Sequence, residues 1–112
     1  MARILLVMDD PMLLKTTALT LEVIGGHKVV EASGVVEGAA HFSGGQSFDL
    51  VIVSCSNGDT LERQIADQHP MQRMMVCDGQ GGDSHSSTTR YVARPQTAYD
   101  LLSPVQGILE RT

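Results

Sequence analysis

Five polar residues follow apolar runs of strand length, and their types define the chemistry open to this chain. They are Asp9, Asp10, Ser54, Asp78 and Arg94. Carboxylates hold Mg²⁺ or pair with a guanidinium, which donates two parallel hydrogen bonds that lysine cannot match. A serine hydroxyl becomes a nucleophile only when a base activates it, and no histidine stands near Ser54 in the sequence. These residues therefore favour ionic contacts and binding over nucleophilic catalysis.

The elements that would position these residues follow an alternating pattern. Apolar runs alternate with segments of helical period, which is typical of an α/β fold with a parallel sheet. We expect strands at 3–8, 28–32, 49–54, 73–77 and 90–93. We expect helices at 11–24 and 34–42, from residue 59 to just before Pro70, and at 98–109. Ligands of such sheets bind beyond the carboxyl ends of the strands, where the five polar residues fall.

Local signals set the helix ends. Asp10 is a suitable N-cap and Pro11 suits the first helical turn, while Gly25-Gly26 should end that helix. Pro104 should kink the last helix or mark a late start. Two sets of apolar residues are expected to face the core. They are Leu14, Ala18, Leu21 and Ile24 in the first helix, and Val36, Ala39, Ala40 and Phe42 in the second.

The segment 78–89 differs from the rest of the chain. It is polar, rich in Gly, Ser and Thr, and lacks helical periodicity. Parallel strands are usually joined by a crossover of a dozen or more residues that forms a helix. We predict a loop here, with the helix missing or reduced to a turn.

In order and spacing, five segments resemble the receiver domain of bacterial two-component response regulators over nearly the whole chain. The segments are 3–11, 29–32, 48–54, 74–77 and 91–95. The resemblance implies one domain, 1–112, with a doubly wound five-stranded parallel sheet in the order 2-1-3-4-5. Receivers place their fourth helix where this chain has the segment 78–89.

The resemblance also assigns roles at the strand ends. Receivers hold Mg²⁺ with acidic residues after strand one and phosphorylate an aspartate after strand three. When the chain is aligned with receivers on Pro11, Met8 falls on the first of the two acidic positions that hold Mg²⁺. Asp9 is then the surviving member of this acidic pair, and Asp10 lies outside it. Ser54 occupies the phospho-acceptor position. The family's Mg²⁺ cofactor is therefore not expected to bind, because its site is degraded.

Two further family positions have changed. Asp78 stands where receivers have a hydroxyl residue, and Arg94, directly before Pro95, replaces their lysine. We hypothesise that Arg94 pairs with Asp9 or Asp78, so that an internal ion pair replaces the metal. Asp9 and Asp78 remain weak candidates for residual Mg²⁺ binding. The simpler alternative is that Asp9 is a strand-end carboxylate.

The resemblance implies a signalling function without enzymatic activity. We expect an atypical response regulator receiver domain that acts independently of phosphorylation by binding a protein, such as a histidine kinase or a downstream regulator. A homodimer through strand five and the last helix is one arrangement the family suggests. The alternative is a regulatory domain that binds a small molecule at the carboxyl rim, with the loop 79–89 closing over it. A third interpretation is a weakly active or alternatively phosphorylated switch.

The composition of the chain limits its expected partners and cellular location. The chain has 112 residues, is 42% hydrophobic and carries a net charge of −5, which argues against non-specific nucleic-acid binding. No apolar run is long enough to span a bilayer, and no signal peptide is evident, so a cytoplasmic location is expected. Cys55 and Cys77 are interpreted as small buried hydrophobic residues, with a redox pair as the alternative, and the scattered histidines as surface residues.

Overall fold

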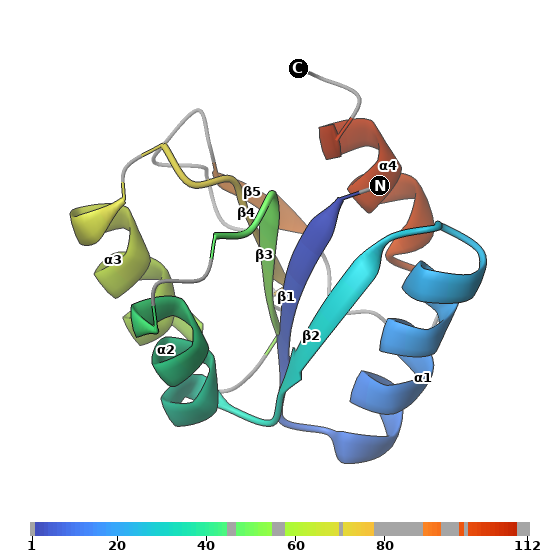
Figure 1. The fold of residues 1–112 in the computed structure, drawn as a ribbon, viewed down its shortest axis with the longest axis horizontal. Helices are drawn as coiled ribbons and strands as arrows, with labels where there is room; N and C mark the ends of the chain where they lie inside the picture. The colour runs from blue at the N-terminus through green and yellow to red at the C-terminus, as the bar shows by residue number, and fades with distance from the viewer. Residues whose placement is uncertain are drawn as a thin grey trace.

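The computed structural model describes residues 2–44, 47–54, 58–69, 71–77, 89–92, 97 and 99–109. Its strands form one parallel sheet in the order β2-β1-β3-β4-β5 (Figure 1), as predicted. The strands are β1 (Arg3–Met8), β2 (Lys28–Ala32), β3 (Leu50–Ser54), β4 (Met74–Cys77) and β5 (Thr89–Val92). All carboxyl ends therefore lie at one edge of the sheet, at the bottom of Figure 1.

Within the described residues, four helices pack on the two faces of this sheet. They are α1 (Pro11–Val23), α2 (Val35–Ser43), α3 (Gly58–Gln68) and α4 (Leu102–Leu109). Figure 1 shows α1 and α4 on one face and α2 and α3 on the other. None of these helices is long and apolar enough to cross a membrane. The expectation of a missing or reduced helix falls mainly on 78–88, which lies outside the described residues.

The alternation of side chains along β1 divides the core into two layers. Ile4, Leu6 and Met8 pack with α1 and α4, whereas Leu5 and Val7 pack with α2 and α3. All five are almost completely buried because helices cover both faces of the sheet. This explains why the strand is a continuous apolar run rather than an alternating one.

The ends of α1 follow the predicted signals. The Asp10 side chain accepts hydrogen bonds from the first turn, with the Asp10 backbone extended (φ −93°, ψ 109°). At the other end Gly26 adopts a left-handed φ of 72°, a conformation that glycine tolerates best. The expectation that Ile24 faces the core is wrong. It lies at the C-cap, past the last helical turn, and is 59% exposed.

The inner face of α2 differs from the one expected. Val36 is 86% exposed and Ala40 is also exposed, so these two expectations are wrong. The helix packs through Gly38 and Phe42, flanked by the half-buried Ala39. A Cβ built on Gly38 would lie 2.9 Å from Cγ2 of Val7, so the absence of a side chain lets α2 approach the sheet closely.

The last helix starts late, as Pro104 predicted. Pro104 lies in the first turn of α4, where a backbone N–H has no partner within the helix. Upstream, Thr97 N donates to Asp100 Oδ2 at 2.9 Å, and Tyr99 N donates to Thr97 Oγ1 at 3.3 Å. These bonds form a compact turn that leads the chain into α4.

Candidate functional site at the carboxyl edge of the sheet

The carboxyl ends of β1 and β3 bring Met8 and Ser54 together. The two residues are register partners in the parallel ladder. Neighbouring strands in a sheet lie about 4.8 Å apart, so whatever occupies one of these positions borders the other. In a receiver both positions would be acidic. Here one is a thioether and the other a hydroxyl.

Both side chains are shielded from solvent. Met8 is 1% exposed and packs in the core layer under α1 and α4, while Ser54 is 8% exposed. Methionine suits an irregular apolar space because its side chain is unbranched and polarizable. The space that an acidic residue would occupy is therefore part of the hydrophobic core.

The neighbouring strand β4 also places an uncharged residue, Cys77, beside Ser54. Val53 pairs with Val76, so Ser54 comes level with Cys77 one residue further along β4. Cys77 is 2% exposed and belongs to the same core layer as Met8. The interpretation of Cys77 as a small buried hydrophobic residue is confirmed. Cys55 lies outside the described residues.

Asp9 and Asp10 have different surroundings although they are adjacent. Asp10 Oδ1 accepts hydrogen bonds from Met12 N at 3.0 Å and Leu13 N at 3.1 Å. It satisfies two donors of the first helical turn, which is the role of an N-cap. Asp9 is the exposed residue directly after β1. The prediction that Asp10 caps the helix is confirmed.

Met8 and Asp10 are poor ligands for Mg²⁺ at this edge. This ion prefers several oxygen ligands in octahedral geometry. One Asp10 oxygen is already engaged by two N–H groups, and the buried Met8 offers only a soft sulfur. Within the described ranges there is no group of three or more His, Cys, Asp or Glu side chains suited to a metal.

Asp78 and Arg94 lie outside the described residues. The ion pair of Arg94 with Asp9 or Asp78, and weak residual Mg²⁺ binding by Asp9 with Asp78, therefore stay predictions.

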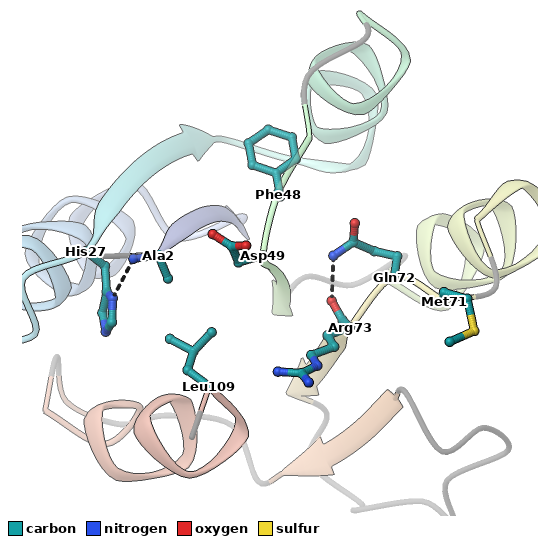
Figure 2. Close-up of a pocket in the computed structure, with 8 residues that line it drawn as sticks. All are labelled: Ala2, His27, Phe48, Asp49, Met71, Gln72, Arg73 and Leu109. Atoms are coloured by element: carbon teal, nitrogen blue, oxygen red, sulfur yellow. Dashed lines mark hydrogen bonds between the residues drawn. The ribbon is translucent and has the colours of Figure 1, made fainter. Parts of the chain in front are cut away.

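A cavity of about 500 Å³ opens at the opposite edge, where the strands begin (Figure 2). The charged side chains that line it form hydrogen bonds to the backbone of distant chain segments. Asp49 Oδ2 accepts a hydrogen bond from Arg3 N at 2.8 Å, and Arg73 donates to Ile108 O at 3.2 Å. In the sequence, Asp49 and Arg73 were expected only as the first residues of two strands, and nothing in the pattern marked them as residues that line a cavity. This cavity does not support the alternative of a ligand site at the carboxyl rim, which stays a prediction.

Comparisons with known proteins agree with this architecture. No protein-family model and no curated protein matches the chain. Among solved structures, a response regulator receiver domain protein from Clostridium thermocellum is 27% identical, with a TM-score of 0.81 over 99% of this chain and 96% of that one.

Two further receivers give the same result. The HemR receiver domain from Leptospira biflexa is 22% identical, with a TM-score of 0.81 over 100% of this chain and 97% of that one. A CheY-like receiver domain protein from Methanospirillum hungatei JF-1 is 24% identical, with a TM-score of 0.77 over 96% and 93%. The chain therefore has the fold of response regulator receiver domains over nearly its whole length, and the predicted resemblance is confirmed.

Proposed function

We propose that this chain is a degenerate receiver domain that signals by binding a protein partner and is not switched by phosphorylation of an aspartate. The observation that carries the proposal is Ser54 at the end of β3, buried and level with Met8. Two of the positions where receivers carry acidic groups thus hold uncharged side chains.

The chemistry of phosphoryl transfer explains why this pair of residues matters. In a receiver an aspartate oxygen attacks phosphorus and a divalent cation neutralises the developing charge. A serine hydroxyl needs a base to remove its proton. The described histidines lie elsewhere: His27 at the amino-edge cavity, His41 next to Glu37 on α2, and His69 beside Phe42. None of these three is at the end of β3.

The proposal has consequences for cofactor and partner. No Mg²⁺ cofactor is required, because one position of the acidic pair is an apolar core residue. Output is expected through a surface contact with a protein such as a histidine kinase or a downstream regulator, in the cytoplasm. The net charge of −5 favours protein over nucleic acid as the partner. A homodimer through β5 and α4 is a further proposal taken from the receiver resemblance.

The test is incubation with a small acyl phosphate and Mg²⁺, followed by intact-mass measurement. Beryllofluoride, which mimics a bound phosphoryl group, serves as a second probe detected by amide chemical shifts. We expect no added phosphate and no shifts near Asp9 or Ser54. An active receiver domain treated in parallel shows that the reagents work. Covalent labelling of the wild-type chain, or beryllofluoride shifts at this edge, would refute the proposal.

Restoring the missing carboxylate sharpens the test. We expect Ser54→Asp to remain unlabelled, because Met8 still occupies the second acidic position. Ser54→Ala is the matched control for the loss of the hydroxyl. Labelling of Ser54→Asp would show that this single position accounts for the loss of phosphorylation.

A further inference from the structure

Helix α1 has an apolar surface on two opposite sides. Its core side is formed by Leu14, Thr17, Ala18 and Leu21, all buried. Met12, Leu19 and Val23 are 80%, 59% and 72% exposed. With about 100° of rotation per residue, these three side chains project roughly 180° away from the centre of the core side. We call the residues Met12, Thr16, Leu19 and Val23 the α1 seam.

The α1 seam has the spacing of a helix-packing surface. Its members follow each other at intervals of four, three and four residues, so they form a continuous line along the helix. Thr16 fits this line because its hydroxyl donates to the Met12 carbonyl at 3.0 Å. Single exposed apolar residues are ordinary on protein surfaces, but a helix that is apolar on both sides is usually covered on both sides.

Two charged residues beside the seam indicate what covers it. Lys15 and Glu22 are exposed and lie two helical turns apart on the same flank of the seam. Neither forms an ion pair within the described part of the chain. In an antiparallel pair of α1 helices related by a twofold axis, equal flanks meet, and Lys15 of one copy lies beside Glu22 of the other. In a parallel pair this flank would face the uncharged Leu13 and Thr20 instead.

We propose that α1 packs antiparallel against α1 of a second copy, with the two seams in contact and two reciprocal Lys15–Glu22 pairs at the edge. The contact is isologous, so α1 by itself joins two copies and no more. A helix of 13 residues is about 20 Å long, so the interface is smaller than the roughly 1,200 Å² of a standard stable complex. The dimer is therefore weak and depends on protein concentration. It is distinct from the contact through β5 and α4.

Sedimentation equilibrium from micromolar to millimolar concentrations measures the association. We expect the wild-type chain to associate through α1 at high concentration, and we expect Leu19→Glu to lose this association. Val36→Glu is the matched control, since it places the same charge at an exposed apolar residue of α2, and it should dimerise like the wild type. A wild-type chain that is monomeric at millimolar concentration, or equal losses in both variants, would overturn the proposal.

Charge reversal tests the orientation of the helices. Lys15→Glu and Glu22→Lys should each weaken dimerisation by about tenfold, because each replaces two attractive contacts with two repulsive ones. The double variant restores both pairs with swapped signs and should recover the wild-type dissociation constant. Since all three variants change only exposed residues, circular dichroism should show intact folding. A double variant no tighter than either single variant would rule out the antiparallel pairing.

Discussion

The cap formed by Asp10 can be tested quantitatively. Its Oδ1 atom accepts two backbone N–H groups of α1, and Leu14 and Leu21 tie that helix to the core. Loss of a cap costs about 1 kcal/mol, and loss of a negative charge at a helix N-terminus about 0.3–1 kcal/mol. We expect Asp10→Ala to lower the free energy of unfolding by about 1–2 kcal/mol, measured by urea denaturation. The melting temperature should fall by about 4 °C per kcal/mol.

Asp10→Asn separates the cap from the charge. Asparagine retains a side-chain oxygen that accepts the same two bonds, so its cost should be only the charge contribution of about 0.3–1 kcal/mol. A wild-type value for Asp10→Ala would refute the structural role. Equal losses in both variants would mean that the negative charge, and not the hydrogen bonds, is what matters.

The same thermal melts, repeated with millimolar Mg²⁺, test the metal site. A ligand that binds only the native state raises the free energy of unfolding. We expect no increase beyond that seen with an equal ionic strength of NaCl. A Mg²⁺-specific increase that disappears in Asp9→Asn would restore a metal-binding role to this edge.

Three further changes have defined outcomes. Thr17 is buried and its hydroxyl has no hydrogen-bond partner among the described residues, so the isosteric Thr17→Val should raise the free energy of unfolding by about 1 kcal/mol in urea denaturation. Gly38→Ala should lower it by about 1 kcal/mol, because crowding of the new Cβ against Val7 outweighs the gain in helix propensity; an unchanged value would show that α2 shifts freely. Hydrogen bonds from Ser33 lower the pKa of Glu37, so Ser33→Ala should raise that pKa in an NMR titration. A carboxyl group whose pKa is lower in the folded than in the unfolded state stabilises the protein at pH values above its unfolded-state pKa. This small contribution is lost as the pH falls through the folded-state pKa.

Most of the fold was predictable because its determinants are local. The continuous apolar run in β1 indicates a strand covered on both faces, and the Gly25-Gly26 pair ends α1 where expected. Which side of a helix faces the core was less predictable. Val36 and Ile24 are apolar yet exposed, since a chain can contain more apolar residues than its core can cover.

Some features of the candidate site were likewise predicted from the sequence, and others were not. The cap at Asp10 was predicted from its position before Pro11 and is confirmed, whereas the assignment of Ser54 to the phospho-acceptor position rests on the receiver resemblance and stays a prediction. The cavity containing Asp49 and Arg73 was not foreseen, because it depends on which strand beginnings meet at the amino edge.

The sequence by itself predicted the order of strands and helices, and the receiver resemblance built on it places Met8 and Ser54 at positions that are acidic in receivers. Only the tertiary structure decided that these two residues are neighbours in the ladder and that Met8 belongs to the core. It also decided that the α1 seam faces away from the sheet. The physical reason is that residue type and periodicity are properties of short segments. Strand register and burial, by contrast, arise from contacts between segments far apart in the chain.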